Sequence, residues 1–333
     1  MILEQAAGAA VMLLFLADIF LTVLYARAGT GFIAPSWDRA IWSLFRAVAN
    51  QSGRRRGAVL SFAGPFIVVS LVGLWALGLT VGAALQIRPE LGTAIRPSSG
   101  ATPTDFITAL LVAGNSLSIV GGGDYAPHTT GTRLLYLINS LVGASVMSLV
   151  LSYLVQVYSA LRERNALALT IDLMTGSTGD AAEMLARLGP NGDYSNATSE
   201  LGNLVQPLAA TKEAHHFYPL LFYFRFGEHR YSASRLGFVL LDLTTLIDTA
   251  LDQQEHATFI RSAAVDSLRR CALLLLQTLD EQFSTGNKGH VGAHTQSYKT
   301  SYAVALATLR RAGVKVQPDG TGYVDERSRG VAP

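Results

Sequence analysis

The chain has 333 residues, of which 50% are hydrophobic and only 15% are charged. This composition is too apolar for a soluble protein of that length, and the long uncharged runs all lie within residues 1–160. The net charge of +2 gives no general attraction for nucleic acid, and the single cysteine, Cys271, excludes an internal disulfide.

Three apolar runs are long enough to cross a bilayer as helices. They are Ala6–Ala26, Gly57–Ile87 and Leu134–Val157. Glu4 precedes the first run and no basic stretch does, so this run is not typical of a signal peptide. We therefore expect an N-terminal transmembrane helix within residues 1–29 and two further spans.

The distribution of arginine predicts how these spans are oriented. Arg27, Arg39, Arg46 and the cluster 54–56 lie between the first and second spans, and Arg162 and Arg164 follow the third. The positive-inside rule places both groups in the cytoplasm. The sequence thus predicts a multi-pass protein of the inner (plasma) membrane, with its N-terminus outside and its C-terminus cytoplasmic.

Residues 30–56 contain an amphipathic segment, WDRAIWSLFRAVA, from Trp37 to Ala49. Trp37, Ile41, Leu44 and Phe45 share one face of a helix. This pattern predicts a cytoplasmic helix lying in the membrane interface.

A shorter apolar run, Phe106 to Val120, cannot cross the membrane as a helix and predicts a re-entrant segment. Asp105 is a suitable N-cap for a helix that begins at Phe106. The C-terminal, negative end of that helix would point toward the membrane centre. The chain would then return outward through the glycines at 121–123, with Asp124 and Pro127 marking its exit.

This order of elements resembles the pore module of potassium channels, over about residues 57–160. Their filter motif is threonine-valine-glycine-tyrosine-glycine-aspartate, which Val120, Gly121, Gly123 and Asp124 match. Pro127 and Arg133 also stand where the family often has these residue types. The resemblance implies a homotetramer around one pore, K⁺ as the permeant ion, and Gly143 as the gating hinge of an inner helix at 130–161. It assigns the filter to residues 118–124: Ser118, Ile119, Val120, Gly121, Gly122, Gly123 and Asp124.

The motif departs from the family pattern at three places. Ile119 replaces the threonine of the innermost ion site, and Gly122 replaces the tyrosine that packs against pore-helix aromatics. Asn115 stands where many relatives have a glutamate beside the filter aspartate. We therefore expect weakened or altered K⁺ selectivity in a filter of carbonyl groups.

The inner helix carries a polar stripe on an otherwise apolar surface. At about 100° per residue its members fall within about 80° of each other; they are Ser145, Ser148, Ser152, Gln156 and Ser159. Two interpretations remain open, because serines either line a wet cavity between several copies or mediate helix packing. The position below the re-entrant segment favours the cavity.

Asp18 lies in the middle of the first span. An intramembrane carboxylate is a candidate functional group. The structural alternative is a hydrogen bond to a neighbouring helix or to Thr22.

From residue 162 to 316 the pattern predicts a cytoplasmic helical bundle, followed by a disordered tail at 317–333. Expected helices cover 166–174, 180–188, 201–223, 232–251, 258–283 and 296–312. The aromatic run HHFYPLLFYFRF from His215 is suited to packing against another domain or the membrane surface. A ligand or a protein partner of this bundle is an open alternative, and the sequence does not identify which one.

The sequence therefore predicts an all-α membrane protein with three transmembrane helices, a re-entrant pore helix and filter, and a helical cytoplasmic domain. The function expected is a tetrameric, potassium-channel-like cation channel. The alternatives are a channel of other selectivity and a non-conducting sensor or scaffold that has kept the channel fold. We expect no enzyme activity, no metal, no nucleic-acid partner and no cofactor besides permeant monovalent ions.

Overall fold

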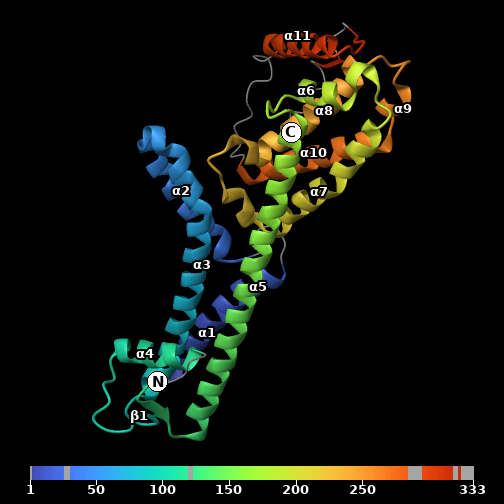
Figure 1. The fold of residues 1–333 in the computed structure, drawn as a ribbon. Coiled ribbons are helices and arrows are strands. Elements are labelled where there is room, and N and C mark those ends of the chain that lie inside the picture. The colour runs from blue at the N-terminus through green and yellow to red at the C-terminus, as the bar shows by residue number, and fades with distance from the viewer. Residues whose placement is uncertain (1, 26–30, 119–122, 284–294, 318–321, 324–333) are drawn as a thin grey trace. The chain divides into compact units, whose positions relative to one another are not determined.

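The computed structural model describes residues 2–25, 31–118, 123–283, 295–317 and 322–323. It is almost entirely helical, with one pair of three-residue strands, which confirms the predicted all-α class (Figure 1). The chain forms two compact units. The first contains residues 1–158 together with 218–223, and the second contains residues 159–217 and 224–333.

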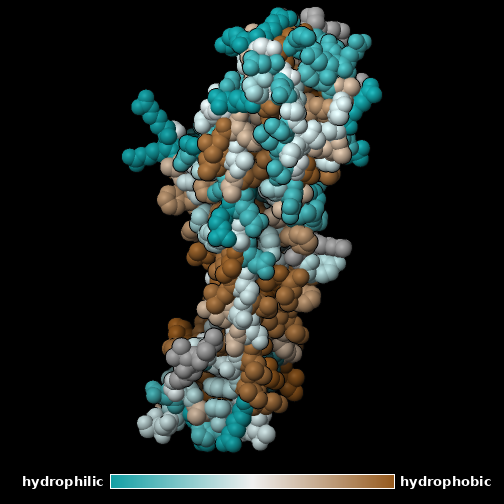
Figure 2. Space-filling model, turned by 45° about the vertical axis from the view of Figure 1, so that its right-hand side comes forward, coloured by the Kyte–Doolittle hydropathy of each residue, from teal (hydrophilic) through white to brown (hydrophobic). Residues whose placement is uncertain are grey.

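Among the described residues, three helices are long and apolar enough to span a membrane, as predicted. They are α1 (Ile2–Ile19) with its π-helical continuation Phe20–Leu24, α3 (Arg56–Ile87), and α5 (Thr130–Met174). Figure 2 shows hydrophobic side chains gathered over the surface of the first unit. Many large apolar side chains of α5 are exposed, such as Leu141 at 60% and Val155 at 70%, so the helix presents faces suited to lipid or to other copies.

α1 and α3 pack antiparallel. At one end, Arg88 pairs with Glu4 at 3.1 Å and Gln5 donates to Glu90 at 2.9 Å. Close approach needs small residues, and a Cβ on Gly8 would lie 2.5 Å from the Gly82 carbonyl oxygen. The N-terminus and the segment after α3 therefore lie at the same end of this pair.

α2 (Ala34–Gln51) covers the expected interfacial segment and packs against α3. Its buried face carries Asp38 and Trp42, whereas Leu44 is 57% exposed. The face that the sequence assigns to the membrane interface is thus only partly free, because the neighbouring stripe packs on protein.

α4 (Phe106–Leu117) forms where the re-entrant helix is predicted. The strands β1 (Ile95–Pro97) and β2 (Tyr125–Pro127) pair antiparallel, with Arg96 opposite Ala126. This pair joins the segment before α4 to the segment that follows the candidate filter.

The second unit is a helical bundle around one apolar core. Its helices are the end of α5, α6 (Ala181–Leu188), α7 (Ala197–Phe217), α8 (Ala233–Ala250), α9 (Ala257–Ile260), α10 (Ala263–Phe283) and α11 (Thr295–Arg311). α7 ends earlier than predicted, because a residue that precedes proline, here Tyr218 before Pro219, disfavours the helical conformation. A 3₁₀ turn, Pro219–Tyr223, follows.

Two residues of the C-terminal segment 317–333 contact the helical bundle. The Gln317 backbone N–H donates to the Ala250 carbonyl at 2.9 Å. Tyr323 is 1% exposed and donates its hydroxyl to Asp242 at 2.7 Å. The Tyr323 ring thus contributes to the apolar core of the bundle.

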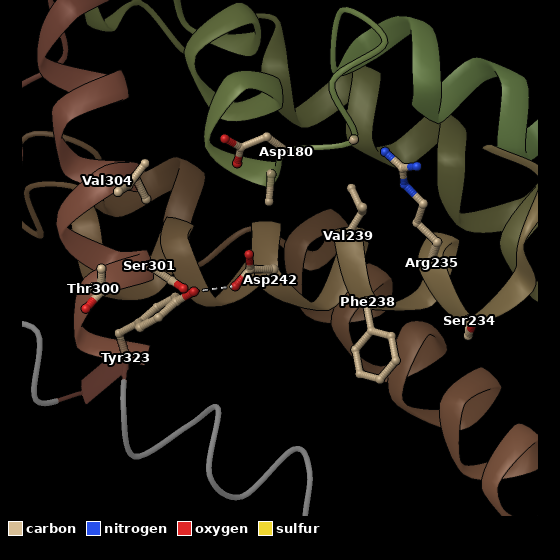
Figure 3. Close-up of a pocket in the computed structure, with 13 residues that line it drawn as sticks. Asp180, Ser234, Arg235, Phe238, Val239, Asp242, Thr300, Ser301, Val304 and Tyr323 are labelled. Atoms are coloured by element: carbon tan, nitrogen blue, oxygen red, sulfur yellow. Dashed lines mark hydrogen bonds between the residues drawn. The ribbon is translucent and has the colours of Figure 1, made fainter. Parts of the chain in front are cut away.

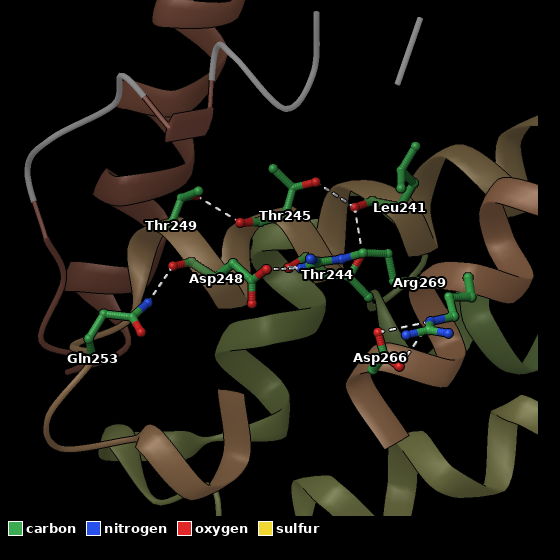
Figure 4. Close-up of polar contacts among 9 residues, drawn as sticks. Leu241, Thr244, Thr245, Asp248, Thr249, Gln253, Asp266 and Arg269 are labelled. Carbon is green, nitrogen blue, oxygen red and sulfur yellow. Dashed lines mark hydrogen bonds and ion pairs between the residues drawn. The ribbon is translucent and has the colours of Figure 1, made fainter. Parts of the chain in front are cut away.

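Polar contacts join α8 to α10 (Figure 4). Arg269 of α10 donates to the Thr244 carbonyl at 2.9 Å and pairs with Asp248. On the next residue, Arg270 pairs with Asp266 of its own helix at 3.0 Å and stays exposed. Only the first of these arginines therefore links two helices of the bundle.

Candidate pore site

The N-terminus of α4 is capped as the sequence predicts. The Asp105 carboxylate accepts from the Thr108 backbone N–H at 3.0 Å and from the Thr108 hydroxyl at 2.7 Å. These bonds, with the hydroxyl bond first, lower the pKa of Asp105. Ala109, Val112 and Ala113 are buried on the side of α3, while Leu111 is 63% exposed. The short helix thus keeps one apolar side free.

Of the candidate filter, Ile119, Val120, Gly121 and Gly122 lie outside the described residues. The two flanks are described. Ser118 caps α4, with its N–H bonded to the Gly114 carbonyl at 2.9 Å. Gly123 has a φ of 115°, and a Cβ there would lie 2.5 Å from the Asn115 side-chain nitrogen. After α4 the chain therefore returns beside the last turn of that helix, and Asn115 lies next to the candidate filter.

Backbone hydrogen bonds hold the segment on the C-terminal side of the candidate filter. The Ser98 N–H donates to the Asp124 carbonyl at 3.3 Å, and the His128 N–H donates to the Ala94 carbonyl at 2.8 Å. The strand pair lies between these two bonds. Asp124 itself is exposed, so its carboxylate is available to solvent cations.

The C-terminal end of α4 touches α5 at Gly143. A Cβ on Gly143 would overlap the Leu117 carbonyl oxygen, so only glycine permits this approach. α5 continues as one helix through this position. In this structure Gly143 acts at a packing contact, and the hinge that the resemblance implies stays a prediction.

A second contact joins the same two helices one turn earlier. Asn139 is fully buried and donates to the Ser116 hydroxyl at 3.0 Å, and that hydroxyl donates to the Ala113 carbonyl at 2.8 Å. The Oδ1 atom of Asn139 is buried without a hydrogen-bond partner among the described residues. This polar pair was not identified from the sequence, although an asparagine in an apolar span is itself a signal.

The polar stripe of α5 is not covered by its own chain. Ser145, Ser148, Ser152 and Gln156 are exposed, and Ser159 is half-buried. The buried residues of the helix, such as Val150 and Val157, lie about 140° around it from the stripe at 100° per residue. The stripe begins two residues after Gly143, so it extends from the level where α4 ends.

One member of the stripe is bonded to a distant segment. The Tyr218 hydroxyl donates to Gln156 Oε1 at 3.0 Å, and the Tyr218 ring meets Tyr153 edge-on with centroids 5.8 Å apart. Tyr223 of the same segment packs on Trp42 of α2 at 5.5 Å. Residues 218–223 therefore belong to the first unit, in agreement with the packing role expected of the aromatic run.

Asp18 is fully buried and bonded to neighbours. Its Oδ1 accepts from the Ile33 N–H at 2.7 Å and the Ala34 N–H at 3.4 Å, at the start of α2. Its Oδ2 accepts from the Trp75 indole of α3 at 2.8 Å. The carboxyl thus links three helices, while Thr22 Oγ1 is buried without a partner among the described residues.

The second unit contains an open cavity of about 740 Å³ between α6, α8 and α11 (Figure 3). Asp242, Arg235 and Phe238 line it, and the Tyr323–Asp242 hydrogen bond crosses one side. No cluster of three or more His, Cys, Asp or Glu side chains suited to a metal occurs in the described parts of the chain.

Comparison with known proteins supports the pore interpretation. Residues 66–160 match a family model, Ion_trans_2, that is described as "Ion channel". The resemblance to a potassium-channel-like pore module is thus confirmed for this part of the chain. The chain is also 22% identical over 255 residues to an uncharacterized membrane protein, YdjJ, of Bacillus subtilis (strain 168). That match covers 74% of this chain and 70% of the relative. No solved structure matches.

Proposed function

We propose that this protein is a cation channel formed by four identical chains around one pore. The observation that carries the proposal is the contact between Leu117 and Gly143. It holds the C-terminal end of α4 at the level where the exposed polar stripe of α5 begins. Carbonyl groups at that end favour a cation, and hydroxyl groups of the stripe suit a hydrated one.

The resemblance supplies the finer features of the proposal. Residues 118–124 form the filter, with selectivity for K⁺ weakened by Ile119 and Gly122. Asp124, exposed beside the strand pair, concentrates cations at the outer mouth. Conduction is passive and involves no enzyme activity. Four chains are needed because one chain supplies a quarter of such a filter.

The location follows from charge and from the α1–α3 contacts. Glu4 and Arg88 lie at one end of the first unit, and α2 with the arginines of 27–56 follows the other end of α1. The positive-inside rule makes the latter end cytoplasmic. The protein would then be a multi-pass plasma-membrane protein with an external N-terminus and a cytoplasmic bundle, open to a ligand or protein partner.

Ion flux from liposomes that contain the purified protein tests the proposal, with K⁺, Na⁺ and Cl⁻ gradients measured separately. We expect cation flux with K⁺ only modestly preferred, and no Cl⁻ flux. Ser152→Trp should block it by filling the cavity. Leu151→Trp, on a neighbouring exposed apolar position, is the matched control and should conduct.

Two results would contradict the proposal. If both tryptophan variants blocked flux equally, the result would contradict the assignment of Ser152 to the cavity lining. Silence under every gradient, from a protein shown to be folded and tetrameric, would favour the non-conducting scaffold.

A further inference from the structure

α2 buries an acidic side chain, Asp38, that forms no ion pair with any residue that the structure describes. Asp38 is 9% exposed, and its Oδ1 atom is buried without a hydrogen-bond partner in the described part of the chain. An ionised carboxylate in such a place is costly unless it is paired, and most buried polar groups are hydrogen-bonded. The site therefore favours the protonated, neutral form of this carboxyl group.

A second buried carboxyl acts on the first. Asp18 is fully buried and accepts hydrogen bonds from the Ile33 N–H at 2.7 Å and from the Trp75 indole at 2.8 Å. Its charge disfavours a second charge on Asp38. Two like charges in a low-dielectric interior do not both persist without compensation.

The other groups around Asp38 do not supply that compensation. Tyr153 of α5 interacts with it, and Tyr218 and Tyr223 of the 3₁₀ turn pack next to Tyr153 and Trp42. The part of α3 from 57 to 87 contains no ionisable residue. On α2, Arg39 and Arg46 are exposed, and no arginine or lysine in the described ranges forms an ion pair with either aspartate.

Burial, and secondly the charge of Asp18, raise the pKa of Asp38 from 3.8 to about 7. A folded-state pKa above the unfolded one gives stability that is full below about pH 4 and is lost as the pH rises through about 7. The contacts of α2 should therefore weaken across that window.

We propose that Asp38 is a proton-binding site, whose neutral carboxyl group keeps α2 packed against α1 and α3. Release of the proton places a second negative charge beside Asp18 and loosens α2. Proton binding at Asp38 would affect α2 and its neighbours whether or not the protein conducts ions.

The three tryptophans of the chain all report on this site. Trp42 lies one helical turn from Asp38, Trp75 is bonded to Asp18, and Trp37 donates to Ser70 of α3 at 3.1 Å. Intrinsic fluorescence of the full-length protein in detergent, followed from about pH 5 to about pH 9, should show one transition near the middle of that range. The infrared band of a neutral carboxyl should be lost over the same transition.

Three variants distinguish the contributions of Asp38, Asp18 and a control carboxyl group. Asp38→Asn should abolish both signals and keep the low-pH fluorescence throughout, because the amide mimics the neutral acid. Asp18→Asn should keep the transition and lower its midpoint by about one pH unit, because the like charge is gone. Asp105→Asn, at the exposed cap of α4, is the control and should titrate like the unmodified protein.

Persistence of the transition in Asp38→Asn would overturn the proposal. So would the absence of a neutral-carboxyl band from the unmodified protein at about pH 5, since a carboxyl with an ordinary pKa near 4 is already ionised there. A midpoint that Asp18→Asn leaves unchanged would also contradict it, because the two carboxyls would then not interact.

Discussion

Gly143 of α5 lies directly against the carbonyl oxygen of Leu117, the last residue of α4. This contact fixes the end of the short helix against the helix that carries the polar stripe. A side chain at position 143 requires one of these two backbones to move, so the residue is a sensitive test of the site.

Replacing Gly143 by alanine should destabilise the first unit by about 1–3 kcal/mol, the usual cost of overpacking a tight contact. The measurement is the thermal unfolding midpoint of the detergent-solubilised protein by tryptophan fluorescence, since all tryptophans lie in that unit. Gly131→Ala, where a Cβ meets open space near the start of α5, is the control and should leave the midpoint nearly unchanged. Equal unfolding midpoints for the two variants would contradict the packing role of Gly143. They would favour backbone flexibility as the reason why position 143 is a glycine.

Cysteines placed on α5 should distinguish the wet stripe from the lipid-facing surface. In a background of Cys271→Ala, Ser148→Cys and Ser152→Cys should react quickly with a charged, water-soluble thiol reagent, because a cavity supplies water and the thiolate form. Met147→Cys and Leu151→Cys, exposed on another side of the helix, should react at least tenfold more slowly in a bilayer, where thiolate formation is suppressed. Similar rates at all four positions would argue for serine-mediated helix packing instead of a cavity.

The second unit should lose stability in mild acid because of His215. This side chain is fully buried, with Nδ1 2.8 Å from the Thr211 carbonyl oxygen, and burial lowers its pKa from 6.5 to about 4. The depressed pKa means that stability is full above about pH 6.5 and falls as the pH drops toward 4, by at most about 1.4 kcal/mol per pH unit. Thermal unfolding followed by circular dichroism should show this slope, and His215→Gln should flatten it. The neighbouring His216→Gln is the control, and an equal flattening there would assign the slope to another cause.

Arg269 and Arg270 provide a matched pair for the stability of the bundle. Arg269→Met removes the link from α10 to Thr244 and Asp248 of α8, and should cost about 1–3 kcal/mol because it leaves a half-buried carboxylate and a carbonyl without their charged donor. Arg270→Met breaks only an exposed pair within one helix, worth about 0.5 kcal/mol or less. Unfolding in urea, followed by circular dichroism, measures both. If the two variants lost comparable amounts of unfolding free energy, the link between α8 and α10 would contribute no more to stability than the exposed pair does.

Local signals in the sequence were sufficient for the elements of the pore. The Asp105 cap, the helix from Phe106 and the three apolar spans depend on residues close together in the chain, and the structure has a helix at each of these positions, the third continuing beyond the predicted span to Met174. The chemistry of the site depends instead on long-range contacts. Nothing near Gly143 in the sequence shows that Leu117 lies against it.

The amphipathic pattern of residues 37–49 predicted the helix α2 correctly, but it did not predict which side chains that helix buries. Hydrophobic periodicity locates apolar side chains, so it directs attention to Leu44 and away from a buried acid such as Asp38. Asp18 was identified from its depth in an apolar span, but its partners come from α2 and α3. The pairing of the two acids depends on how three helices meet, and periodicity within one helix carries no information on that.

The Tyr218–Tyr223 segment has a consequence for any attempt to dissect the protein. A fragment cut at the end of the inner helix, as the order of elements along the chain invites, would retain Trp42, Tyr153 and Gln156 but lose the aromatic side chains that pack on them. The membrane part would then expose an apolar surface that the intact chain covers, with the attendant risk of aggregation. The smallest separable pore therefore does not correspond to a continuous stretch of sequence, and a minimal version would need residues 218–223 returned through a linker.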